Sequence, residues 1–273
     1  MQIYDSAAKR TPVISQLREI WASRGLLRLL VIRDLTVRYK RSVIGIWWSL
    51  LNPILTTTVL FYVFNTVFMR GLQNRETFLP YLFSGVLMMT LFNQSLNFAA
   101  ESVSTGSGVL NKVYVRPEVF ALSGPISSTI NFIFGLVPLT VVLYLTHHSL
   151  SAKALLLPVF ILAMALFTTG IGLLMAIAYL EFDDSRHLIA VLLLMLQYMT
   201  PVFYPINILG DTTQRVIKLN PLTSYLDVFR NIYGNTYAAT TTDWLVVIVS
   251  SIVVFCFGLI FFARWWPKGV TKL

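Results

Sequence analysis

Residues 245–263 read LVVIVSSIVVFCFGLIFFA, an apolar run without a single Asp, Glu, Lys or Arg. As a helix, a run of this length crosses a hydrocarbon layer of about 30 Å. Five further stretches also lack these residues and are long enough to cross: 43–68, 78–100, 119–145, 154–180 and 188–209. Because backbone groups in lipid must be paired within their own segment, each run is expected to be a helix. The sequence therefore predicts an all-α integral membrane protein with six transmembrane helices.

The composition agrees with a membrane protein: 56% of the residues are apolar, 12% are charged, and the mean hydropathy is +0.71. One cysteine, Cys256, and three histidines show no metal-ligand spacing, so the sequence predicts neither a disulfide nor a metal site. No G-x-x-x-x-G-K-[ST] phosphate loop occurs, and no residue is a candidate for catalysis or for binding a cofactor. ATP and Mg²⁺, if used, must be bound by a partner chain.

None of the six stretches has an acidic or basic residue at its centre. Transporters driven by protons or ions usually need such groups inside the membrane, so ion coupling is disfavoured. Any energy for transport is expected to come from a separate subunit.

Lysine and arginine set the expected orientation, because cytoplasmic loops are enriched in them. Of the 21 in the chain, fifteen fall on the side of the two termini and six on the other side. Both termini are therefore predicted to be cytoplasmic. This asymmetry also explains the net charge of +9 without nucleic-acid binding.

The basic arm 1–42 precedes the transmembrane region 43–273, and the two are read as a single domain. Thr11-Pro12 is a helix-start signal, after which Val13, Leu17 and Trp21 recur at helical spacing. This pattern predicts an amphipathic helix that ends near Gly25, followed by a second, basic segment over 26–41. Such an arm can simply anchor the first span at the lipid surface, or it can also dock a partner or guide a phosphorylated lipid.

Prolines predict irregularities in the spans. Pro53, Pro125 and Pro138 predict kinks, whereas Pro201 and Pro205 predict that the later part of the fifth stretch is broken or re-entrant. Beyond them, residues 205–243 are long for a loop. The segment places these apolar residues on one helical face: Leu222, Tyr225, Leu226, Phe229, Ile232 and Tyr233. Re-entrant gate helices before the last span, or an interfacial helix that only packs, both fit this pattern.

Aromatic rings stack on the C–H faces of sugars, which makes membrane aromatics candidates for a glycan pathway. The candidates are Trp47, Trp48, Tyr62, Tyr198, Phe203 and Tyr204. Most aromatics in membrane proteins serve packing or the lipid interface, so one or two of the six are enough for a pathway.

Three motifs resemble one known family. Residues 33–53 read RDLTVRYKRSVIGIWWSLLNP, residues 112–119 read KVYVRPEV, and PVFYP at 201–205 is followed by LNPL at 219–222. Together with the spacing of the apolar stretches, they resemble the ABC-2-type polysaccharide exporter permeases, which include O-antigen, teichoic-acid and mycobacterial galactan exporters. The resemblance covers nearly the whole chain.

The resemblance implies a homodimer that works with two ATP-binding subunits in the cytoplasmic membrane of a bacterium and exports a polyprenyl-pyrophosphate-linked glycan. The N-terminal helix would be an interface helix and 101–111 a coupling helix. Candidate contacts with the ATPase are Leu17, Trp21, Glu101, Ser104, Gly106, Leu110 and Asn111. Candidate first contacts for the pyrophosphate are Arg38, Lys40 and Arg41. Candidate gate residues are Pro201, Pro205, Asn220, Pro221, Tyr225 and Phe229.

Two alternatives remain open from sequence. One is an ABC-2 permease for a drug or small lipid, which would share this architecture. The other is a membrane-embedded transferase acting on a lipid carrier, whose acid or base would have to come from the acidic cluster Glu181, Asp183 and Asp184.

Overall fold

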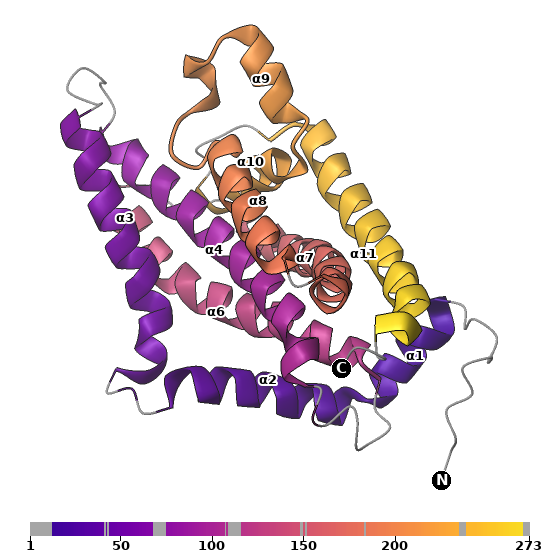
Figure 1. Ribbon diagram of the computed structural model, residues 1–273. Coiled ribbons are helices and arrows are strands. Elements are labelled where there is room, and N and C mark those ends of the chain that lie inside the picture. The colour runs from indigo at the N-terminus through magenta and orange to yellow at the C-terminus, as the bar shows by residue number, and fades with distance from the viewer. Residues whose placement is uncertain are drawn as a thin grey trace.

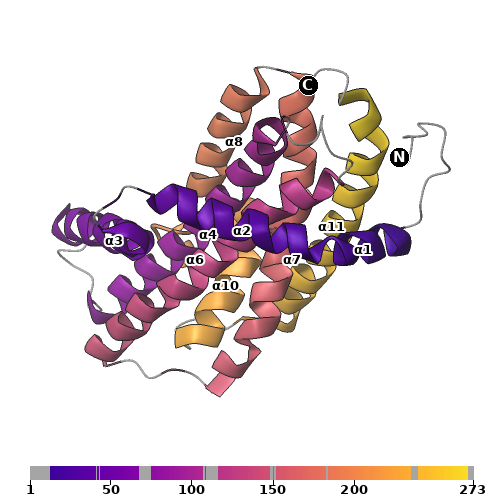
Figure 2. The ribbon, with the colours of Figure 1, turned by 90° about the horizontal axis from the view of Figure 1, so that it is seen from below.

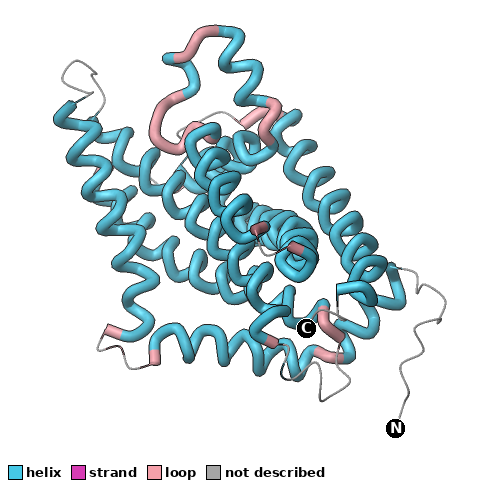
Figure 3. Tube along the Cα trace, in the orientation of Figure 1, coloured by secondary structure: helices cyan, strands magenta, loops and turns pink. Residues whose placement is uncertain are grey.

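The computed structural model describes residues 13–40, 42, 44–67, 75–106, 108, 116–147, 150, 152–182, 184–234 and 239–269. Within these ranges the chain is helical and no strand occurs (Figure 3). The longer helices are α1 (Val13–Ala22), α2 (Arg24–Tyr39), α3 (Trp48–Val67), α4 (Arg75–Thr105), α6 (Glu118–Leu145), α7 (Leu157–Glu181), α8 (Ser185–Met199), α9 (Asp211–Lys218), α10 (Pro221–Gly234) and α11 (Thr241–Gly269). Short 3-10 turns are η1 (Gly45–Trp47), η2 (Ala152–Leu156) and η3 (Ile206–Ile208).

Three described stretches are both long and apolar enough to cross a membrane: Glu118–Leu145, Ala152–Glu181 and Thr241–Pro267. Two shorter apolar helices, Trp48–Phe64 and Ser185–Met199, accompany them. Helix α4 has 31 residues, ample length for a crossing, but carries Asn93, Gln94, Ser95 and Asn97 in its second half. The chain is thus an all-helical, multi-pass membrane protein.

The helices form a bundle with a distinct structure at each end (Figure 1). Helix α2 lies across the lower end in this view, beneath α3, α4 and α6, and α1 continues beside the last turns of α11. Seen from that end, α1 and α2 form one bar across the bundle (Figure 2). Helices α9 and α10 lie at the opposite end.

Helix α4 packs extensively against α6 and α7, and α7 packs extensively against α11. The α7–α11 contact is close because two glycines face each other. A Cβ added at Gly258 would lie 2.4 Å from the carbonyl oxygen of Gly170, and one added at Gly170 would lie 2.4 Å from that of Val254. Small residues let helix backbones approach where lipid supplies no hydrophobic drive for association.

Helix α2 is attached to the bundle by both apolar and polar contacts. Leu30 is buried in a cluster with Val103 and Phe120, and Ser123 Oγ of α6 donates a hydrogen bond to Asp34 Oδ2 at 2.9 Å. Arg116, just before α6, forms an ion pair with Glu19 of α1. The arm therefore packs against the ends of the spans.

The element boundaries agree with several expectations. The two helices of the arm are present as α1 and α2, although Thr11-Pro12 lies outside the described residues. Helix α8 ends at Met199, before Pro201, and residues 200–205 are not helical. Helix α4, however, continues to Thr105, so the first part of the expected coupling helix is the last turn of α4. The Glu101 side chain is exposed there.

Candidate functional site

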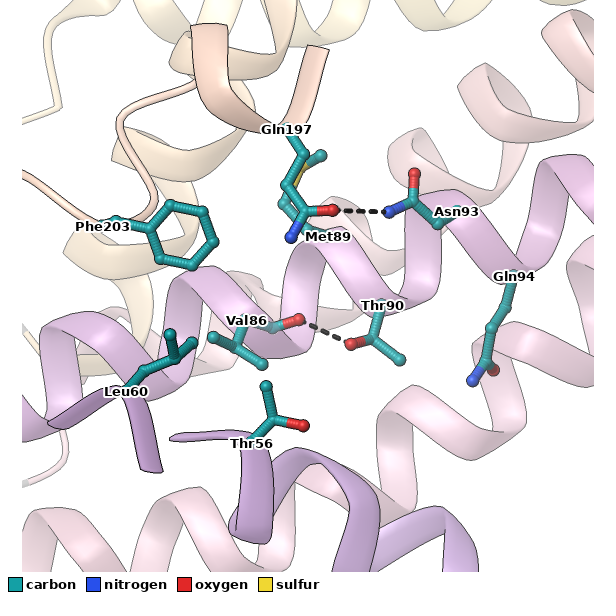
Figure 4. A pocket seen from close by; sticks show the side chains of 9 residues that line it. All are labelled: Thr56, Leu60, Val86, Met89, Thr90, Asn93, Gln94, Gln197 and Phe203. Atoms are coloured by element: carbon teal, nitrogen blue, oxygen red, sulfur yellow. Dashed lines mark hydrogen bonds between the residues drawn. The ribbon is translucent and has the colours of Figure 1, made fainter. Parts of the chain in front are cut away.

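A groove lined by uncharged side chains lies between α3, α4, α8 and the residues that follow α8 (Figure 4). Its lining residues are Thr56, Leu60, Val86, Met89, Thr90, Asn93, Gln94, Gln197 and Phe203. Threonine, asparagine and glutamine supply hydrogen-bond donors and acceptors without charge, and the apolar members supply flat or branched surface. The groove can therefore hold a neutral, polyhydroxylated molecule without a strong electrostatic trap.

Helix α4 supplies one wall of the groove, and α8 meets it at one polar contact. Asn93 Nδ2 donates a hydrogen bond to Gln197 Oε1 at 3.4 Å, and the Thr90 hydroxyl donates to the carbonyl of Val86 at 2.7 Å. The hydroxyl of Thr90 is occupied within its own helix, whereas Asn93 and Gln197 face each other across the groove (Figure 4). A long bond between two amides can exchange for bonds to a ligand.

Aromatic rings gather at one end of the groove. Phe203 stacks on Phe64 with 6.3 Å between ring centroids, and the ring centroid of Tyr198 lies 5.9 Å from that of Phe203. The Tyr204 hydroxyl donates to the carbonyl of Tyr198 at 2.9 Å. Of the six aromatic candidates from sequence, Phe203 is the one that lines the groove, and Tyr198 and Tyr204 support it.

The other sequence candidates for the pathway lie apart from the groove lining. Trp47, Trp48 and Tyr62 have exposed side chains, with Tyr62 71% exposed. Lys40 is exposed at the end of α2. Arg41 and the side chain of Arg38 lie outside the described part of the chain.

A buried arginine lies next to the residues that form the aromatic end of the groove. Arg230 of α10 is 2% exposed. Its Nη1 donates to the carbonyl of Pro201 at 3.0 Å, and its Nη2 donates to that of Tyr81 at 3.1 Å. We call Tyr81, Ser84, Pro201, Val202 and Arg230 the arginine lock.

The residues proposed as a gate are partly core residues. Tyr225 and Phe229 are fully buried. The Tyr225 hydroxyl donates to the carbonyl of Val247 at 3.0 Å, and the ring of Phe229 stacks on that of Phe160 with 5.4 Å between centroids. Asn220 Nδ2 donates to the Thr200 hydroxyl at 3.0 Å, which ties the start of α10 to the end of α8. Pro201 is buried, and Pro205 and Pro221 are half-buried. We call the non-helical residues 200–205 the break, and these contacts hold α10 and the break together as one unit.

Asp227 lies one turn before Arg230 on α10, outside the apolar spans. Burial raises the pKa of Asp227 to about 6, and Asp243 adds to the shift, while Arg230 and Lys218 oppose it. Desolvation disfavours the ionised carboxylate, which explains the direction.

The candidate ATPase contacts lie at the end of the bundle that α2 crosses. Trp21 is 71% exposed and Leu17 is exposed, which is unusual for an apolar face unless lipid or a partner covers it. Gly106 is buried against Phe120. The Ser104 side chain, Leu110 and Asn111 lie outside the described residues.

A second polar feature lies inside the α4–α6 contact. Gly124, Ser128, Asn131 and Gly135 share one face of α6, and both glycines meet side chains of α4. Ser128 and Asn131 are buried, and the Ser128 hydroxyl and both amide atoms of Asn131 have no hydrogen-bond partner among the described residues. We call Ser128 and Asn131 the polar seam.

Sequence reasoning missed the groove amides and the burial of Arg230. A signal for the amides was present, because Asn93, Gln94 and Gln197 interrupt charge-free apolar stretches. Arg230 gave none, because it lies off the apolar face of the segment 205–243 and counts simply as one of the six lysines and arginines opposite the termini. Its acceptors come from residues more than a hundred positions away in α4 as well as from the break.

The sequence matches the model of the family described as ABC-2 type transporter over residues 25–233, which runs from α2 to the end of α10. The chain belongs to this family. Its resemblance to polysaccharide exporter permeases is confirmed, and the chain is accordingly a permease subunit of a transporter and not an enzyme.

Similar proteins include the O-antigen export system permease protein RfbA of Myxococcus xanthus, 32% identical over 81% of this chain and 85% of that protein. The capsule polysaccharide export inner-membrane protein CtrC of Neisseria meningitidis is 22% identical over 94% of this chain and 96% of its own length. The polysialic acid transport protein KpsM of Escherichia coli is 18% identical over 74% of this chain and 78% of its own.

Proposed function

We propose that this ABC-2 permease is the membrane-spanning subunit of an ATP-driven exporter of polysaccharide carried on a lipid. The observation that carries the proposal is the groove, because its lining offers amides and hydroxyls without charge beside the ring of Phe203. Such a surface suits sugar hydroxyls and C–H faces, and the names of the three relatives point to the same class of cargo.

In this proposal, two copies of the chain together form the export pathway. The groove is formed by α3, α4 and α8, and α8 carries exposed apolar residues beside the face of Gln197, among them Val191, Leu194 and Tyr198. A second copy placed over these residues would cover them and complete the wall of a passage. Two ATP-binding subunits would then supply the energy.

The ATP-binding subunits would dock at the end of the bundle crossed by α2. Exposed Leu17 and Trp21 of α1 and exposed Glu101 at the end of α4 gather at this end. The excess of lysine and arginine on the same side supports cytoplasmic termini, and Arg38, Lys40 and Arg41 would meet the pyrophosphate of the carrier. A total of six spans, with α9 and α10 as gate helices, completes the proposed organisation of the region 43–273 behind the arm 1–42.

A permease for a drug or small lipid is the alternative within the same family. Such cargo is largely apolar and would be indifferent to loss of the groove amides, whereas a glycan would not. The two cargo classes therefore differ in what they predict for the same substitutions: loss of export for a glycan and no change for a drug or small lipid.

The test is to express the chain with the ATPase encoded beside it and measure glycan at the cell surface. Asn93→Leu combined with Gln197→Leu is expected to lower export at least fivefold, because the groove loses its facing amides. Thr56→Val in the groove is expected to lower export about twofold, while Thr58→Val, whose hydroxyl bonds within α3 and whose side chain is exposed, should leave it unchanged.

Amounts of folded protein in the membrane serve as the control for every variant. Unchanged export from the double variant at normal protein level would overturn the polysaccharide pathway. Failure to purify any ATPase with the chain would overturn the transporter assembly.

A further inference from the structure

Arg230 holds three separate parts of the chain together with one side chain. Besides its bonds to the carbonyls of Pro201 and Tyr81, it donates from Nη2 to the carbonyl of Val202 at 3.4 Å and from Nε to Ser84 Oγ at 3.4 Å. The guanidinium also lies over the ring of Tyr81, 3.4 Å from the centroid. Helix α10, helix α4 and the break after α8 thus meet at this cation.

Neighbouring residues are arranged around these contacts. The Tyr81 hydroxyl donates to the carbonyls of Pro201 and Tyr204, at 2.8 and 2.6 Å. A Cβ added at Gly85 would lie 2.9 Å from Arg230 Nη2 and 3.0 Å from Val202 Cγ1, so glycine leaves the space that the guanidinium and the break occupy. Tyr81 therefore holds two of the break's carbonyls beside the bonds of Arg230.

Burying the guanidinium removes its hydration, which costs free energy unless hydrogen bonds at fixed positions replace the lost water. The named hydrogen-bond acceptors of Arg230 are neutral oxygens, three of which are backbone carbonyls. A proline break leaves carbonyls without helical partners, and the arginine supplies donors for them. The cation thereby fixes where the break lies against α4.

The lock adjoins the groove directly on both walls. Val86 of the groove follows Ser84 and Gly85 on α4, and Phe203 of the groove follows Val202 in the break. Any movement of the break away from α4 therefore moves Phe203 and opens this end of the groove. Conversely, while Arg230 holds the carbonyls of Pro201 and Val202, Phe203 stays in place.

We propose that Arg230 is a latch that keeps this end of the groove closed, and that the break opens only when its bonds to Pro201 and Val202 are released. The latch rests on the proposed function, because it is the closed end of the export pathway. Sugar hydroxyls can replace the lost carbonyl acceptors of the guanidinium, so an arriving glycan favours the open form. Arg230 is in this sense a positioning residue, acting through the break.

The experiment measures access to the break rather than export. In membranes that contain the permease and its ATPase, with Cys256→Ser as background, Val202→Cys places a single thiol at a fully buried position. A membrane-impermeant maleimide applied from outside is expected to label it slowly. Adding Arg230→Met is expected to raise the labelling rate at least tenfold.

Matched variants separate the latch from general damage. Arg215→Met, an exposed arginine on the neighbouring α9, should leave labelling unchanged. Tyr81→Phe keeps the ring but loses the two hydroxyl bonds, so the labelling rate is expected to rise about threefold. The labelling rate of Arg230→Lys should lie between those of the parent and of Arg230→Met. Tyr81→Phe also provides the test if Arg230→Met does not fold.

Two results would overturn the latch: unchanged labelling in both Arg230→Met and Tyr81→Phe with folded protein, or an equal rise in Arg215→Met. Labelling does not depend on the cargo. A normal latch with no glycan export would therefore disprove the proposed function alone, and normal export with no change in labelling would disprove the latch alone.

Discussion

The arginine lock and the polar seam are two places where polar groups are buried between helices, and they are satisfied to different degrees. In the lock, Arg230 and Tyr81 together donate to the carbonyls of Tyr81, Pro201, Val202 and Tyr204. In the seam, Ser128 and Asn131 have side-chain polar atoms that no described group pairs. A paired buried group fixes one geometry, whereas an unpaired one costs stability at its position.

The difference indicates that hydrogen bonds fix the relative positions of the segments at the lock, whereas no hydrogen bond of these side chains does so at the seam. The lock joins segments that are far apart in sequence and tolerates little displacement, because its donors and acceptors have fixed directions. The seam lies in an extensive helix contact with glycines at both ends, which depends on close packing rather than on hydrogen bonds. Substitutions at the two places should therefore change stability in opposite directions.

The largest effect is expected from Arg230→Met measured as stability in detergent. The substitution removes the four hydrogen bonds of the guanidinium, and the carbonyl of Val202 loses this donor, which should lower the free energy of unfolding by about 3 kcal/mol and the melting temperature by several degrees. Arg215→Met is the matched control and should melt as the parent does. Equal melting of the Arg230 variant would mean that the lock adds no stability and would remove the contrast with the seam.

An effect of opposite sign is expected from Asn131→Leu. Replacing an unpaired buried amide with an apolar side chain of similar size should raise the free energy of unfolding by about 1 kcal/mol. The melting temperature in detergent measures this, with Asn207→Leu at an exposed position in η3 as the control. A lower melting temperature for Asn131→Leu would show that the amide is paired in the membrane, and the seam would then resemble the lock.

The smallest effect concerns pH and the surroundings of the lock. The folded pKa of Asp227, about 6, lies above its ordinary value of 3.8, so folding favours the protonated form. The contribution of this group to stability is therefore full below about pH 4 and is lost as the pH rises through about 6. Asp227→Asn should remove that part of the pH dependence of the melting temperature.

Asp211→Asn, at an exposed carboxylate on α9, is the control for the Asp227 experiment and should keep the pH dependence of the parent. If Asp227→Asn also keeps it, the carboxylate is solvated and the interior around the lock is more open than the structure shows. The contrast between the lock and the seam would then depend on Arg230 alone.

Much of the fold could be predicted from residue patterns. Charge-free runs determined that the chain is helical and membrane-embedded, Pro201 and Pro205 predicted the break after α8, and the pattern after Thr11-Pro12 predicted the helices of the arm. The groove was only partly predicted: Phe203 was a candidate, but Asn93 and Gln197 were not, since their meeting depends on how α4 and α8 pack. The six-span total and the gate remain predictions.

The sequence by itself determined which segments are helices in lipid and which family they make, because hydropathy and local motifs are properties of neighbouring residues. Only the tertiary structure decided that Arg230 is buried, that Tyr81 lies beneath it, and that the groove is lined by uncharged amides. Burial and pairing arise from residues that the chain brings together over long separations. No local pattern encodes which carbonyl a distant guanidinium will meet.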